Sequence, residues 1–137
     1  MVDTNVLFSF FGKTGTRKLI YSLYDSGVDL YTPSFARREL EKLRDVIQKK
    51  AEIDDASFDL IATYLFMLVR EVPFMVYAEY IHKASEITPD PDDVDFVALA
   101  LKYGCKIWTL DKALLAAEQV PTVSTLELAK LFETRSR

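Results

Sequence analysis

Residues 93–111 read DVDFVALALKYGCKIWTLD, and this stretch carries the pattern that decides the fold class. Apolar side chains recur at helical spacing through residues 96–100. Gly104 is the residue type that commonly ends a helix, and the short apolar run 106–109 predicts a strand. Asp111 then begins another short helical pattern. A helix, a strand and a helix in direct succession favour an α/β protein with a parallel sheet.

The same alternation extends outward along the whole chain. The patterns predict helices over residues 16–27, 33–47, 54–70, 78–87, 93–103 and 111–117, and a last helix opened by the capping box Ser124-x-x-Glu127. They predict strands over residues 1–2, 28–32, 72–77, 106–109 and 122–123. With neither a repeat nor a linker-like segment, we expect one domain over residues 1–137, with three α/β/α layers and a parallel sheet of about five strands.

Composition excludes several classes of protein. Among 137 residues, 17 Lys and Arg against 21 Asp and Glu give a formal net charge of −4, which argues against a generally basic nucleic-acid-coating protein. The single Cys105 excludes a disulfide framework and a cysteine-based zinc site. The apolar run 60–69 is shorter than the ~18 residues of a membrane helix. We therefore expect a cytoplasmic protein that does not enter a membrane.

Two acidic residues follow predicted strands, and a third lies at the edge of a helical apolar face. Asp3 follows the first strand and Asp111 follows the strand 106–109, and ligands gather at such carboxyl ends of parallel strands. Glu39 lies roughly 70° from the centre of the predicted apolar stripe on its helix. The plainer interpretations are a helix cap for Asp111 and a solvated edge residue for Glu39.

A fourth candidate comes from the acidic cluster at the start of the helix 93–103. Asp93 shares a face with Phe96 and Val97, whereas Asp95 is turned by roughly 200° and is expected to meet solvent. We expect Asp92 to cap the helix, and capping is also the plainer interpretation of Asp93.

Four converging carboxylates repel one another and require a cation. Oxygen ligands without nearby His or Cys favour Mg²⁺ or Mn²⁺ over zinc. Such ions commonly polarise a phosphoryl oxygen and activate water, so the residues alone favour hydrolysis of a phosphodiester or a phosphomonoester.

Four motifs in order resemble those of the PIN-domain ribonucleases along the whole chain. They are Val2-Asp3-Thr4-Asn5-Val6-Leu7, Arg38-Glu39-Leu40, Asp93-Val94-Asp95-Phe96-Val97-Ala98-Leu99-Ala100 and Ile107-Trp108-Thr109-Leu110-Asp111-Lys112. The chain is most similar to short prokaryotic members, including the VapC-type toxins. Leu110 departs from the pattern, because the family usually has Asn at that position.

The resemblance implies a five-stranded parallel sheet and a site that cleaves RNA with Mg²⁺ or Mn²⁺. Asp3, Glu39, Asp93 and Asp111 would then be the catalytic, metal-binding acids. Asn5 and Thr109 would orient them through hydrogen bonds, although Asn5 could instead form a turn and Thr109 could be an ordinary strand end.

The expected partners follow from the same interpretation. Lys13 and Arg38 are the leading candidates for contacts with RNA phosphates. The apolar run 64–68 is expected in the core, with a homodimer surface or an antitoxin-binding groove as the alternative. We expect a homodimer, with an antitoxin protein as a candidate partner. A weakly catalytic RNA- or protein-binding module and a flap-type DNA nuclease remain open alternatives.

Overall fold

The structure, a computed structural model, describes residues 1–12 and 15–136. Its strands form two parallel pairs: β1 (Leu30–Pro33) with β2 (Val69–Val72), and β3 (Ile107–Trp108) with β4 (Thr122–Val123). Val2 lies between the two pairs. Its backbone N–H donates to the Tyr31 carbonyl at 2.7 Å, and it forms an isolated parallel bridge with Trp108. Parallel pairing is as expected for an α/β fold.

The expected continuous sheet of five strands is not what the structure has. Residues 1–2 make a single bridge rather than a ladder, because the chain turns into a helix immediately afterwards. Asp3 is the N-cap of α1 (Thr4–Ser9), a helix that the sequence patterns did not predict. The N-terminal segment, β1 and β3 therefore meet at Val2, and the chain enters α1 at the next residue, Asp3.

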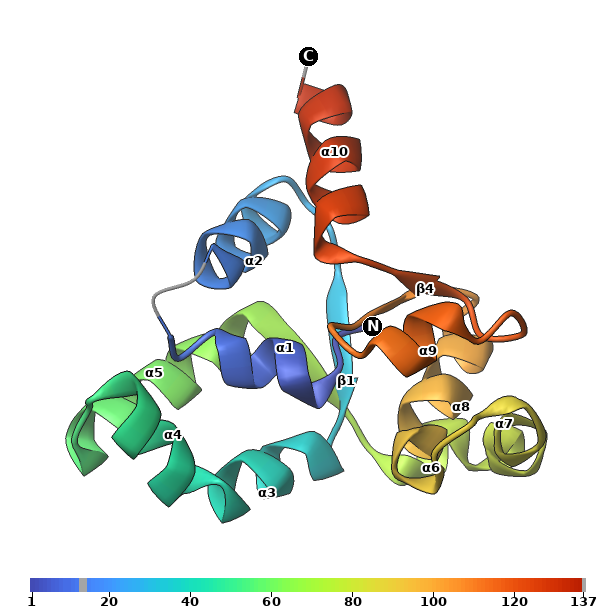
Figure 1. Cartoon of the computed structure of the whole chain (residues 1–137), viewed down its shortest axis with the longest axis horizontal. Coiled ribbons are helices and arrows are strands. Elements are labelled where there is room, and N and C mark those ends of the chain that lie inside the picture. Colours follow the sequence, from blue (N-terminus) through green and yellow to red (C-terminus); the bar gives the residue numbers. More distant parts are fainter. Residues whose placement is uncertain (13–14, 137) are drawn as a thin grey trace.

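Helices lie on both sides of these strands (Figure 1), with α1 to α5 to one side of β1 and α6 to α9 to the other. The bounds of the remaining helices are α2 (Thr16–Asp25), α3 (Phe35–Lys42), α4 (Arg44–Ala51), α5 (Asp55–Leu68), α6 (Phe74–Tyr77), α7 (Ile81–Ile87), α8 (Val94–Tyr103), α9 (Lys112–Ala116) and α10 (Thr125–Ser136). Two short 3₁₀ helices, η1 (Ala78–Tyr80) and η2 (Pro91–Asp93), precede α7 and α8. Helix α8 is the most deeply buried, with residues 96–100 at most 2% exposed.

Three sequence-based predictions of elements were wrong in detail. The strand expected over residues 72–77 ends at Val72, because Pro73 has no N–H for the ladder and starts α6 instead. The helix expected over residues 33–47 is divided at Leu43 into α3 and α4. Thr16 does not cap α2; Gly15 holds that position, and the Thr16 hydroxyl lies 2.9 Å from the Ser9 hydroxyl.

Other local signals were confirmed. Gly104, at φ +62°, ends α8 in the left-handed region that glycine adopts without strain. The capping box of α10 forms in both directions, since the Glu127 N–H donates to the Ser124 hydroxyl and the Ser124 N–H donates to the Glu127 carboxylate. Within the described residues, every helix is too short or too polar to cross a bilayer.

Candidate functional site

Five carboxylates line one pocket of about 320 Å³, which we call the acid pocket. They come from four separate parts of the chain: Asp3, Glu39, Asp92, Asp93 and Asp111. Thr4, Asn5, Phe8, Leu43 and Phe96 complete the lining. The acidic residues are up to 108 positions apart in sequence, from 3 to 111. The fold therefore concentrates acidic side chains at one end of its short strands, where α/β proteins commonly bind ligands.

Asp3 is held at the bottom of this site by its place between strand and helix. The Thr4 N–H donates to its Oδ1 at 2.7 Å, and the Thr109 hydroxyl donates to its Oδ2 at 2.7 Å. Only 4% of Asp3 is exposed. Burial raises the pKa of its carboxyl above the usual value, against the lowering effect of the Thr109 hydrogen bond. Both oxygens have donors, which fixes the orientation of the side chain.

Thr109 links the acidic residues of two strand ends. Its fully buried hydroxyl donates to Asp3 and also accepts the backbone N–H of Asp111 at 3.0 Å and the Asn5 Nδ2 at 3.4 Å. Asn5 in turn accepts the Leu110 N–H at 3.2 Å through its Oδ1. Asn5 therefore contacts Thr109 and the backbone of the next residue rather than a carboxylate.

Asp111 has two roles at once. Its Oδ1 accepts the N–H groups of Ala113 and Leu114 at 2.9 and 3.5 Å, which caps α9, and its side chain also lines the acid pocket. The two interpretations considered from the sequence are thus compatible in one residue. A capped carboxylate still has a second oxygen with which to bind a ligand.

Glu39 and Asp93 show the electrostatic cost of the arrangement. The pKa of Glu39 is raised mainly by burial, and to a smaller extent by the negative charges of Asp92 and Asp3. Burial, followed by the charges of Asp3, Asp90 and Asp111, raises the pKa of Asp93 to about 7. Asp93 occupies the N-cap position of α8, yet its side chain makes no capping hydrogen bond. Its carboxylate lines the acid pocket instead.

Two neighbours of Asp93 lie in environments other than those predicted from the sequence. Asp92 was expected to be a helix cap, but Asp90 caps η2 by accepting the Asp92 N–H at 2.9 Å, and Asp92 lines the pocket. Asp95 was expected in solvent, but it is half-buried and accepts the Tyr77 hydroxyl at 2.6 Å. A 3₁₀ turn precedes α8, so α-helical spacing did not apply to residues 91–93. The Asp-Pro-Asp-Asp sequence was the available signal for that turn.

No basic side chain lines the acid pocket in the part of the chain that the structure describes. Arg38 is exposed and is not among its lining residues. Lys13, the other expected phosphate contact, lies outside the described residues. The nearest compensation for Glu39 is the Lys42 charge, which lowers its pKa against the stronger effects that raise it.

The donor set has the chemistry that a hard divalent cation prefers. Carboxylate oxygens with no thiolate or imidazole among them suit Mg²⁺ or Mn²⁺. The geometry is not closed, however: within residues 1–12 and 15–136, no group of three or more His, Cys, Asp or Glu is already arranged to hold an ion. Mutual repulsion keeps the carboxylates apart in the absence of an ion, and they would have to approach one another to bind a cation.

Comparison with known proteins gives one family match. The family model described as PIN domain matches residues 1–130 of the chain. No curated protein and no solved structure gives a significant match.

Proposed function

Because the chain belongs to the PIN-domain family, whose members are generally nucleases that need a divalent metal, we propose that it is an endoribonuclease. In this proposal residues 1–137 form a single nuclease domain that hydrolyses RNA phosphodiester bonds with Mg²⁺ or Mn²⁺. Asp3, Glu39, Asp93 and Asp111 hold the metal. The single observation that carries the proposal is the acid pocket, in which five carboxylates gather with no basic side chain among the described residues that line it.

In this proposal, hydrogen bonds hold two of the four ligands, Asp3 and Asp111, in a fixed orientation, and the four carboxylates approach one another around the ion. Asp3 is fixed at both oxygens, Asp111 is fixed through its cap, and Glu39 and Asp93 extend into the same pocket from α3 and the start of α8. A divalent ion held by these residues would polarise a phosphoryl oxygen of the substrate and lower the pKa of a water molecule. It also offsets the negative charge that would otherwise repel an RNA phosphate from this pocket.

Thr109 is the positioning residue in this proposal. Its hydroxyl donates a hydrogen bond to the Asp3 carboxylate. This bond orients the carboxylate and thereby sets the direction of the lone pairs that remain for a metal. The hydroxyl also accepts the Asp111 N–H, so one side chain sets the orientation of one ligand and the backbone of another. Asn5 acts one step further away, by bonding Thr109 and the Leu110 N–H.

Cleavage assays test the proposal directly. With Mn²⁺, the purified protein is expected to cut single-stranded RNA, and Asp93→Asn or Asp3→Asn is expected to abolish the cutting. A protein that binds RNA but cuts none with Mn²⁺ or Mg²⁺ would be the binding module instead. Preferential cutting of branched DNA would identify a flap-type nuclease.

Metal binding can be measured without any substrate. Mn²⁺ at about 100 times its Kd should stabilise the protein by about 2.7 kcal/mol, seen as a higher Tm that EDTA reverses. Asp93→Asn should lose most of this shift. A Tm that does not respond to Mn²⁺ in the parent protein would remove the metal from the proposal.

The finer biological role is also proposed. We propose a cytoplasmic toxin of a toxin–antitoxin pair that forms a homodimer. Co-expression with the protein encoded by the neighbouring reading frame should suppress the ribonuclease activity, and sedimentation should show two copies of the chain. Activity that is unaffected by that neighbour would contradict the toxin role while leaving the nuclease proposal in place.

A further inference from the structure

Two further pockets lie near the acid pocket, and one of them adjoins it. The first, of about 250 Å³, shares Asn5 and Phe8 with the acid pocket and is also lined by Lys50. The second, of about 790 Å³, shares Phe11 and Ala51 with the first. Each pocket shares lining residues with the next, so the three lie in a row, with the smaller of the two further pockets in the middle. We call the two further pockets together the side groove.

The charge of the side groove is opposite to that of the acid pocket. Arg17 and Lys18 line its larger part and Lys50 its smaller part, and among the residues that the structure describes no carboxylate lines either pocket. Arg17 is held at the wall, since its Nε donates to the Phe10 carbonyl at 2.9 Å and its guanidinium lies over the Phe10 ring. Within the described residues, Lys18 and Lys50 form no ion pair. The side groove is therefore a largely apolar surface with three basic side chains, on a chain of net charge −4.

Exposed aromatic rings lie beside these cations. Tyr21 and Tyr64 line the larger pocket, stack on each other with ring centroids 6.1 Å apart, and are 49% and 40% exposed. At the other end, the Lys50 ammonium lies 5.6 Å from the centre of the Phe8 ring, which faces both the acid pocket and the side groove. Cations that follow a backbone, combined with aromatic faces on which bases stack, are the features of sites for single-stranded nucleic acid.

We propose that the side groove binds the single-stranded RNA that flanks the phosphate placed in the acid pocket. The proposal rests on the proposed nuclease function and adds the path of the substrate to it. Lys50 contacts the phosphate nearest the acid pocket, Arg17 and Lys18 contact phosphates further along, and Tyr21 with Tyr64 stacks on a base. Duplex RNA, whose bases are not available for stacking, should bind this groove less tightly.

Adjacent lysines on α4 give a matched pair of variants for the test. Lys49 and Lys50 are both exposed, but only Lys50 lines the side groove. Binding of a labelled oligouridine of about ten nucleotides, in EDTA so that nothing is cut, should be several-fold weaker for Lys50→Gln and unchanged for Lys49→Gln. Lys50→Gln should also reduce the salt dependence, by about 0.7 in the slope of log affinity against log salt concentration.

Tyr21 tests the stacking contribution separately. Tyr21→Leu removes the aromatic face and should weaken binding about tenfold, whereas Tyr21→Phe keeps that face and should bind like the parent. Circular dichroism of each variant verifies folding, and the exposed Lys50 variant keeps the test open if Tyr21→Leu does not fold. In Mn²⁺, Lys50→Gln and Tyr21→Leu should raise the KM for RNA and leave kcat nearly unchanged.

The outcomes separate the groove from the nuclease function. If RNA is cut normally and Lys50→Gln behaves like Lys49→Gln while Tyr21→Leu behaves like Tyr21→Phe, the groove proposal is overturned and the nuclease proposal stands. If RNA binding follows the predicted pattern but no cutting occurs, the groove stands and the nuclease proposal fails. If Tyr21→Leu instead changes the sedimentation of the protein without changing RNA binding, the face is an interface between copies and the groove proposal is overturned.

Discussion

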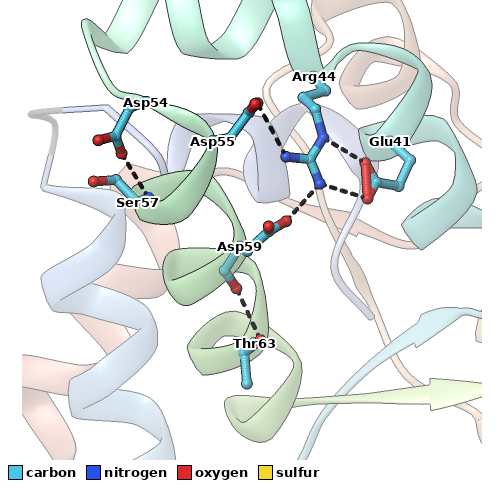
Figure 2. A network of polar contacts seen from close by, with 7 residues as sticks. All are labelled: Glu41, Arg44, Asp54, Asp55, Ser57, Asp59 and Thr63. Atoms are coloured by element: carbon cyan, nitrogen blue, oxygen red, sulfur yellow. Dashed lines mark hydrogen bonds and ion pairs between the residues drawn. The ribbon is translucent and has the colours of Figure 1, made fainter.

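Glu39 and Glu41 are separated by one residue on α3, yet they belong to acidic clusters of opposite electrostatic character. Glu41 joins Asp55 and Asp59 around Arg44 on the outside of the molecule (Figure 2). Glu39 faces the acid pocket, where no cation lines the wall among the described residues. A helix turns successive residues by about 100°, so neighbours at i and i+2 point to nearly opposite sides.

The outer cluster supplies its own counter-charge. Arg44 donates through Nε and Nη2 to the two oxygens of Glu41 at 3.0 and 2.9 Å, and also bonds Asp55 and Asp59 at the start of α5. Its guanidinium lies 4.3 Å from the centre of the Phe58 ring. The hydrogen bond with Arg44 lowers the pKa of Glu41, so this carboxylate is more stable in its charged form than it would be alone.

The acid pocket has the opposite balance. The pKa values of Asp3, Glu39 and Asp93 are all raised, because burial and neighbouring negative charges disfavour the ionised forms. Arg44 lies among three carboxylates on the surface, whereas none of the described residues that line the acid pocket supplies a cation to its five carboxylates. This contrast supports a bound cation as the missing partner and a functional origin for the cluster.

The largest effect should be the difference in RNA cleavage between two variants of α3, in which Glu39 or Glu41 is replaced separately by Gln. With Mn²⁺, Glu39→Gln should lower kcat/KM for RNA at least about 100-fold, because it removes a proposed metal ligand. Glu41→Gln, on the same helix, should leave cleavage within a factor of two. Equal losses in both variants would show that the acid pocket has no special role.

Thr109→Val should have the next largest effect, because it keeps the shape and removes the hydroxyl. We expect metal affinity from calorimetry to fall about 10- to 100-fold, since Asp3 loses the donor that orients it. The free energy of unfolding should fall by about 1–3 kcal/mol, because buried partners of the hydroxyl lose a hydrogen bond. Thr109→Ser should recover most of the affinity, and a failure to do so would point to packing rather than orientation.

The pH dependence of stability should differ between the two clusters. In metal-free protein, burial and the neighbouring carboxylates raise the pKa of Asp93 from 3.8 in the unfolded chain to about 7 in the folded protein. Between these two pH values the Asp93 carboxyl is therefore more fully protonated in the folded protein than in the unfolded chain. Lowering the pH from 7 to about 4 should therefore raise the contribution of Asp93 to the free energy of unfolding, by about 1–2 kcal/mol after solvent screening.

Urea denaturation of the parent protein and its variants at several pH values measures the free energy of unfolding and tests this prediction. Asp93→Asn in EDTA should be more stable than the parent at pH 7 and should lose this part of the pH dependence. The pKa of Glu41 is lowered instead, so its stabilisation is present above the unfolded value of 4.5 and is lost as the pH falls further. Glu41→Gln should therefore not alter the profile between pH 7 and 5.

The smallest effect should come from Arg44→Met, which leaves the outer carboxylates without their cation. Exposed ion pairs contribute little, so we expect a small fall in Tm that is reduced further at high salt. Cleavage of RNA should not change. A large loss of activity would mean that the packing of α3, α4 and α5 around Arg44 controls the position of Glu39.

Local signals explain why much of the site could be found from sequence. Helical spacing separated Glu39 from Glu41, and the apolar residues Phe96 and Val97 that follow Asp93 made it a candidate. The strand-end positions of Asp3 and Asp111 followed from short apolar runs, and all four residues line the acid pocket. Asp92 was missed because a 3₁₀ turn changes the direction of residues 91–93.

The sequence by itself determined the alternation of helices and parallel strands, the glycine end of α8, the capping box of α10 and the order of the acidic motifs, because each depends on residues a few positions apart. Only the tertiary structure decided that Val2 joins two strand pairs, that Thr109 connects Asp3 to Asp111, and that basic and aromatic residues of α2, α4 and α5 line two neighbouring pockets near the acid pocket. Those contacts join residues up to about a hundred positions apart, and their geometry depends on packing that no local pattern records.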